Sequence, residues 1–170
     1  MNNEKFDFGY GPVAAHKHPN GGGWVADSAT VAETAYVGER ARVYGNAQVY
    51  GNARVYNSAQ VCSNALVYGN ALVCDSAQVY DNAVVYGNAQ VCGNALVYGL
   101  CSRTPVVVSG YEYVVTIQDE IVSVGCKTIT ITDLEDTSKL FPEENCPELR
   151  KAGTIISWLA RLHCSKNDIK

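Results

Sequence analysis

Histidine and cysteine are the side chains of this chain best suited to catalysis or to metal binding. The chain has three histidines, and all of them lie outside its long middle segment: His16, His18 and His163. A general base must come within hydrogen-bond reach of the group that it deprotonates, and the middle segment offers none. We therefore predict no catalytic residue, and we expect His16 and His18 to belong to a mobile or surface leader.

The seven cysteines do not have the spacing of a zinc module. They are Cys62, Cys74, Cys92, Cys101, Cys126, Cys146 and Cys164. No CxxC pair is present, whereas structural zinc sites use closely spaced pairs of ligands. The odd number, together with an N-terminus that does not resemble a secretory signal, favours reduced thiols in a cytoplasm. We predict no metal and no cofactor.

A six-residue repeat occupies the middle of the chain. Thirteen valines stand six residues apart from Val25 to Val97, and an alanine stands two residues before each valine after the first. Side chains alternate along an extended segment, so Ala and Val share one face. The Gly-Asn pairs that follow are suited to corners. Such short units cannot bury their apolar face alone, and they must coil and stack as a parallel β-solenoid.

The run GNAQVYGNARVYNSAQVCSNALVYGNALV resembles the bacterial-transferase hexapeptide repeat. This resemblance covers residues 24 to 99 and implies a left-handed parallel β-helix with 18 residues per triangular coil, which gives about four coils. The hand comes from the resemblance alone. Enzymes of that family use a histidine base, and the related carbonic anhydrases use three histidines on zinc, but these coils contain no histidine.

The flanks resemble uncharacterised hexapeptide proteins of phages and prophages. The opening FDFGYGPVAAHKHPNGGGWVADSA and the later YVVTIQDEIVSVGCKTITI carry this resemblance. Neither flank implies a known chemistry. Together they suggest a phage or prophage origin.

The ends of the chain are expected to cap the solenoid, because open ends expose unpaired strand edges. We predict a mainly β protein in three parts: an N-terminal leader (1–23), a hexapeptide β-helix (24–100) and a small α+β C-terminal cap (101–170). The polar hexads near Trp24 to Arg42 are expected to cap the N-terminal end. In the C-terminal part the sequence predicts strands at 105–108, 111–117 and 121–125, and helices at 133–140 and 147–164.

The 18-residue period sorts the outward side chains onto three faces. The most apolar of them carries a tyrosine ladder and no charge: Gln48, Tyr50, Leu66, Tyr68, Val84 and Tyr86. Aromatic side chains suit any sheet, but a tyrosine-rich and charge-poor patch also marks a binding surface. Cys74 and Cys92 are 18 residues apart and therefore stack on adjacent coils. A bond between them is sterically conceivable, although a cytoplasm favours free thiols.

The charge balance guides the choice of partner. The net charge of −4 makes nucleic acid and membranes poor candidates. A small anionic ligand would need basic groups near the coils, and the candidates are Arg42, Arg54 and Arg103.

These observations favour a non-catalytic, phage-like β-helical binding protein. It would form a dimer or trimer in the cytoplasm of a bacterial host and occupy or sequester a host protein or a small signalling ligand, for example as a counter-defence inhibitor. One alternative is a hexapeptide acyltransferase with a displaced site, using His163 from a neighbouring subunit. Another is a structural virion or scaffold component.

Overall fold

The structure is a computed structural model of the 170-residue chain, and it describes residues 4–99, 106–108, 115–118, 121–124 and 127–130. The chain divides into two compact units, Met1–Pro105 and Val106–Lys170. Each unit is described by itself below.

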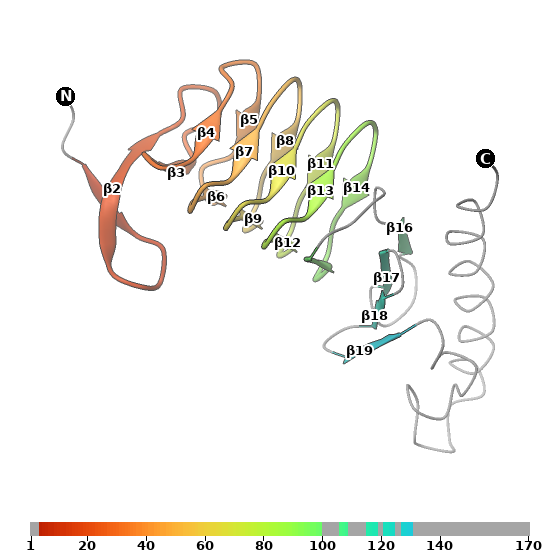
Figure 1. Cartoon of the computed structure of the whole chain (residues 1–170). Coiled ribbons are helices and arrows are strands. Elements are labelled where there is room, and N and C mark those ends of the chain that lie inside the picture. The colour runs from red at the N-terminus through yellow and green to blue at the C-terminus, as the bar shows by residue number, and fades with distance from the viewer. Residues whose placement is uncertain (1–3, 100–105, 109–114, 119–120, 125–126, 131–170) are drawn as a thin grey trace. The chain divides into compact units, whose positions relative to one another are not determined.

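The first unit is a parallel β-solenoid of about four turns (Figure 1). Its thirteen strands are β3(Trp24–Ala26), β4(Thr30–Val31), β5(Tyr36–Val37), β6(Arg42–Val43), β7(Gln48–Val49), β8(Arg54–Val55), β9(Gln60–Val61), β10(Leu66–Val67), β11(Leu72–Val73), β12(Gln78–Val79), β13(Val84–Val85), β14(Gln90–Val91) and β15(Leu96–Val97). Each strand pairs with the strand 18 residues further along, as Val49 with Val67 and Val67 with Val85. The predicted period is therefore confirmed.

Three parallel sheets enclose the core. One sheet contains β3-β6-β9-β12-β15, the second β4-β7-β10-β13 and the third β5-β8-β11-β14. We call them sheet B, sheet D and sheet E. Twelve of the thirteen repeat valines are fully buried, and Val31 in the first coil is the one that remains partly exposed. Small and branched side chains alternate in the interior because each coil leaves room for only one Ala and one Val per side.

The corners depend on a residue in the left-handed region. From Gly45 onward this residue recurs every six positions, and at four corners it is not glycine: Asn57, Ser63, Asp75 and Asp81. Short polar side chains tolerate this conformation better than most residues do. The next residue is often asparagine, and its side chains stack between coils, as in Asn46 to Asn64 and Asn64 to Asn82, both 3.3 Å.

The N-terminal end is capped by residues that precede the repeat. Strands β1(Lys5–Asp7) and β2(Pro12–Lys17) form an antiparallel hairpin that extends sheet B beyond β3. The chain then crosses the edge of β5, where Val37 N donates to Asn20 O (3.0 Å) and Gly23 N donates to Val37 O (2.9 Å). The prediction that the hexads near Trp24 to Arg42 form this cap was wrong, because a repeat coil cannot cover its own open edge.

Glycine is required where this crossing segment meets the first coil. At Gly23, a Cβ atom would lie against the carbonyl oxygen of Gly38 and 2.6 Å from Val37 Cγ1. Gly21 faces the carbonyl of Val37 in the same way and has a φ of +116°. The GGG sequence before Trp24 therefore permits a backbone approach that no side chain allows.

The second unit contains a four-stranded antiparallel meander. Its strands are β16(Val106–Val108), β17(Val115–Gln118), β18(Ile121–Val124) and β19(Lys127–Thr130), paired in chain order. Ile117 and Val122 are fully buried. The strands predicted at 105–108, 111–117 and 121–125 correspond to β16, β17 and β18, and β19 is an additional strand. The predicted helices at 133–140 and 147–164 lie outside the described residues. In the described part of the chain, no helix is long and apolar enough to cross a bilayer.

Candidate functional site

The predicted tyrosine ladder lies on the outer face of sheet D. Strand pairing brings Gln48, Leu66 and Val84 into one row, and Tyr50, Tyr68 and Tyr86 follow them as a second row. Each of the three tyrosines is 37% exposed. The rings of Tyr68 and Tyr86 stack at 5.4 Å with an interplanar angle of 11°. We call this surface the tyrosine face.

Repetition makes the tyrosine face rigid and regular. The backbone of each strand is bonded to the next coil, as in Tyr50 N to Val67 O (2.9 Å) and Tyr68 N to Val85 O (3.0 Å). The Tyr50 hydroxyl also donates to Gln48 Oε1 at 3.1 Å. The strands of sheet D carry no charged residue. A flat surface of this kind loses little conformational entropy and desolvates no charge when it is covered.

The N-terminal hairpin builds a second feature on sheet B. Its aromatic side chains pack onto the first coils, with Phe6 stacked on Trp24 at 4.6 Å and Phe8 stacked on Tyr44 at 4.9 Å. Phe8 is only 5% exposed. Arg42 lies beside this cluster, with its Cζ atom 5.3 Å from the centre of the Phe6 ring. The hairpin therefore fixes the position of an arginine that belongs to the repeat.

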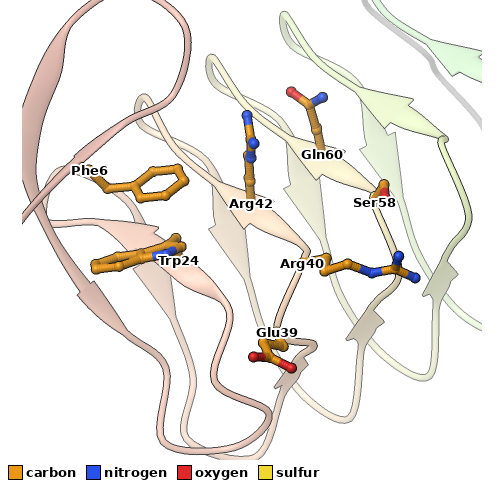
Figure 2. Close-up of a pocket in the computed structure, with 7 residues that line it drawn as sticks. All are labelled: Phe6, Trp24, Glu39, Arg40, Arg42, Ser58 and Gln60. Carbon is orange, nitrogen blue, oxygen red and sulfur yellow. The ribbon is translucent and has the colours of Figure 1, made fainter.

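A hollow of about 390 Å³ lies next to this cluster (Figure 2). It is lined by Phe6, Trp24, Glu39, Arg40, Arg42, Ser58 and Gln60. Figure 2 shows Arg42 and Gln60 side by side on neighbouring strands, with Glu39 and Arg40 on the loop that leads into β6. The Tyr44 hydroxyl donates to Gln60 Oε1 at 3.0 Å and holds that amide in place.

A smaller hollow of about 280 Å³ lies beside sheet E, and Glu39 and Arg40 line it as well. Its other lining residues are Tyr36, Gly38, Arg54, Tyr56 and Asn57. The Arg54 Cζ atom is 5.5 Å from the ring centre of Tyr36 and 5.8 Å from that of Tyr56. We call Arg40, Arg42 and Arg54 the arginine corner.

In the described part of the chain, no carboxylate lies at ion-pair distance from the arginine corner. Among residues 4–99 the only ion pair joins His16 Nδ1 to Asp27 Oδ1 at 2.9 Å. Of the predicted basic candidates, the structure places Arg42 and Arg54 on two different hollows, and Arg103 lies outside the described residues. Arg40, which lines both hollows, was missed by the sequence reasoning. The charged residues Glu39 and Arg40, at corner positions where the later hexads carry mostly Gly, Asn and Ser, were the available signal.

The two N-terminal histidines differ from each other. His16 is exposed and pairs with Asp27, whereas His18 is only 3% exposed and its Nδ1 lies 3.2 Å from the carbonyl oxygen of Asn20. The expectation of a mobile or surface leader was therefore wrong for His18, because the crossing segment packs it against the first coil. His163 lies outside the described residues.

Cys74 and Cys92 form a disulfide that joins two adjacent coils of sheet E, with a Cα–Cα distance of 4.6 Å. The expectation of free thiols was wrong for this pair, because the 18-residue stacking brings the two sulfurs together. Asp75 completes a group of three possible metal ligands within 4.8 Å of one another. In the disulfide the sulfurs are bonded to each other and cannot act as thiolate ligands. Cys62 is a free thiol on sheet B.

Several ionisable groups of the hairpin and of the coils have pKa values that differ from their ordinary values. Burial, with smaller contributions from Cys62, raises the pKa of Tyr44, and burial likewise raises the pKa of Tyr10 and of Tyr80. Hydrogen bonds from the backbone of Gly9 and Gly11 lower the pKa of Asp7, and the charge of Arg42 contributes least in the same direction. Burial thus favours the neutral form of these tyrosines, and the hydrogen bonds favour the charged form of Asp7.

Comparison with known proteins agrees with this architecture. The repeat family described as YdcK beta solenoid repeat matches residues 47–63, 59–75, 77–91 and 89–103. No curated protein and no solved structure matches the chain. The coils and the matched repeats define the chain as a repeat β-solenoid protein. The matches begin at residue 47, so they include Arg54 and leave out the N-terminal hairpin, Arg40 and Arg42.

Proposed function

We propose that this protein is a non-catalytic β-helical binding protein that acts by occupying or sequestering its target. The tyrosine face is the observation that carries this proposal. It is wide enough to span three coils, uniform in exposure and free of charge. Tyrosine is enriched at protein interfaces, where its ring contributes apolar area and its hydroxyl keeps a hydrogen bond.

The proposal includes finer features that the sequence suggests. We propose a left-handed coil of the hexapeptide type, a phage or prophage origin, and action in the cytoplasm of a bacterial host, where the target would be a host protein or a small signalling ligand. Residues 101–170 would cap the C-terminal end of the coils. The acyltransferase and structural-component alternatives gain no specific support from the described residues.

We further propose that the tyrosine face joins copies of this chain into a dimer or trimer. Identical rows of side chains repeat every coil, so one copy can meet another over several coils at once. Self-association would bury the three tyrosines together with Leu66 and Val84, and it would leave the arginine corner on a different face available to a ligand.

The test is the mass of the assembly in native mass spectrometry. The Tyr68→Glu variant places a charge at the centre of the tyrosine face, and its burial without a partner should dissociate the assembly. Gln90→Glu on sheet E is the matched control, since it adds the same charge to another exposed strand position, and it should keep the mass of the parent protein. A monomeric parent protein would refute self-association, and equal masses for both variants would refute the role of this face.

A further inference from the structure

The arginine corner combines cationic groups with hollows of ligand size, and it is separate from the tyrosine face. We propose that it binds a small phosphorylated ligand of about nucleotide size, with the phosphate groups at Arg40 and Arg42 and the rest of the ligand in the larger hollow. This inference rests on the proposed function, action by occupancy, and it names the class of ligand.

Two of the three arginines, Arg42 and Arg54, are held against aromatic rings before any ligand arrives. Arg42 lies over the ring of Phe6, and Arg54 lies near the rings of Tyr36 and Tyr56. A guanidinium group that uses its face against an aromatic ring keeps its N–H donors, which lie in its plane, for another partner. Those donors match two oxygens of a phosphate group. The aromatic rings therefore lower the entropy cost of ordering long side chains.

Within residues 4–99 the three arginines of the corner form no ion pair with a carboxylate. Carboxylates are more numerous than cations in the whole chain, which carries 17 acidic and 13 basic residues. Even so, no carboxylate among residues 4–99 lies within ion-pair distance of these three arginines. Glu39 is close enough to line both hollows without pairing with Arg40. The protein thus keeps a local excess of positive charge in an acidic molecule, which favours an anionic ligand.

The hollow offers contacts for more than a phosphate group. Its volume of about 390 Å³ falls within the roughly 300–1,000 Å³ that is typical of small-molecule sites. Ser58 and Gln60 provide hydroxyl and amide groups on one side, and Glu39 provides an acceptor for a hydroxyl or amine of the ligand. Inorganic phosphate would use the arginines alone, whereas a nucleotide would use these groups as well.

Arg40 should contribute most because it lines both hollows, and Arg42 should follow because it lines the larger one. Arg54 belongs to the smaller hollow, so its removal should have a smaller effect. An arginine that binds two phosphate oxygens is not replaced by lysine, which offers a point charge on a flexible stem. Arg40→Lys should therefore weaken binding although the charge is retained.

The experiment is isothermal titration calorimetry of the full chain with ADP and with pyrophosphate, at low and at moderate salt. Both probes should bind the parent protein, and ADP should bind more tightly. Arg40→Gln and Arg42→Gln should each weaken ADP binding by roughly tenfold or more, as expected for the loss of a hydrogen bond between charged groups. Lys5→Gln removes a charge of the hairpin outside both hollows, and it should leave the affinity unchanged.

Three results would overturn the inference. The first is that neither ADP nor pyrophosphate binds at millimolar concentration. The second is that Lys5→Gln and Arg40→Gln lose the same amount of affinity. The third is that a single-stranded oligonucleotide binds and ADP does not. The oligomeric mass of Arg40→Gln should equal that of the parent protein. A failure of ligand binding is therefore distinguished from a failure of the tyrosine face, which is measured by mass alone.

Discussion

The regular coils and the N-terminal end of the solenoid differ in charge and in the kind of surface that they form. Residues 43–99 contain three charged residues, whereas residues 4–42 contain nine. In the coils every position has the same environment as the position 18 residues away, so the outer faces become uniform rows. At the N-terminal end segments outside the repeat pack against the first coils, and the hollows lie there beside Arg40, Arg42 and Arg54. Repetition therefore produces a rigid, flat surface, whereas the segments that pack against the repeat produce hollows lined by charged side chains.

The disulfide tests how far the coils depend on a covalent link. Reduction of the bond between Cys74 and Cys92 should lower the free energy of unfolding by about 3 kcal/mol, because the link closes a loop of about 18 residues in the unfolded chain. The measurement is urea denaturation with and without a reductant. In a Cys74→Ser, Cys92→Ser double variant the reductant should have no effect, and an equal effect there would contradict the prediction.

Gly23→Ala should destabilise the N-terminal end, including the first coil, and leave the later coils intact. The new Cβ would collide with the backbone of Gly38 and with Val37 Cγ1, 2.6 Å away, and such overpacking costs about 2–3 kcal/mol. Hydrogen exchange should show the loss of protection in β1, β2 and β5 before that in β10.

The control for this variant is Gly22→Ala. Nothing lies within 4 Å of a Cβ atom at Gly22, and only the φ of +75° opposes the substitution. A cost of about 1 kcal/mol is expected there. Similar losses for the two variants would show that backbone conformation, and not the close approach at Gly23, decides the effect.

The same Val→Thr substitution should cost more stability in the regular coils than in the first coil. Val67→Thr places a hydroxyl in a fully buried site of the coils, among Ala and Val side chains that cannot form a hydrogen bond with it. The substitution should lower the free energy of unfolding by about 2 kcal/mol. Val31→Thr in the first coil should cost less, about 0.5 kcal/mol, because that side chain is partly exposed. Thermal unfolding of both variants measures the difference, and equal losses would contradict a distinction between the regions.

Ser63→Gly should have the smallest effect and should stabilise the coils. Ser63 has a φ of +60°, and glycine relieves the strain of an L side chain in this region at some entropic cost, for a net gain of about 0.5–1 kcal/mol. Ser76→Gly, at a corner position outside the left-handed region, should instead lose about 0.5 kcal/mol. Urea denaturation of the two variants gives the sign of each change.

The repeat alone was enough to predict most of the solenoid. Period six with Ala and Val two residues apart fixes which side chains face inward. The 18-residue coil implied by the family resemblance then placed Tyr50, Tyr68 and Tyr86 on one face, in agreement with the strand pairing. The N-terminal end could not be predicted in this way. The burial of His18 and the stacking of Phe6 on Trp24 depend on contacts between segments that share no repeat.

The sequence by itself determined a stacked β-solenoid and which side chains face inward, because both follow from local alternation and a constant spacing. The 18-residue coil, and with it the three faces, came from the family resemblance. Only the tertiary structure decided that a hairpin caps the first coil, that Cys74 and Cys92 are bonded, and that Arg40 lies between two hollows. The cap and the position of Arg40 depend on how an irregular segment packs against a regular one, whereas the disulfide depends on how closely two stacked coils bring the sulfurs together. A periodic pattern describes the neighbours of a residue within the repeat, and it carries no information about what meets the repeat from outside.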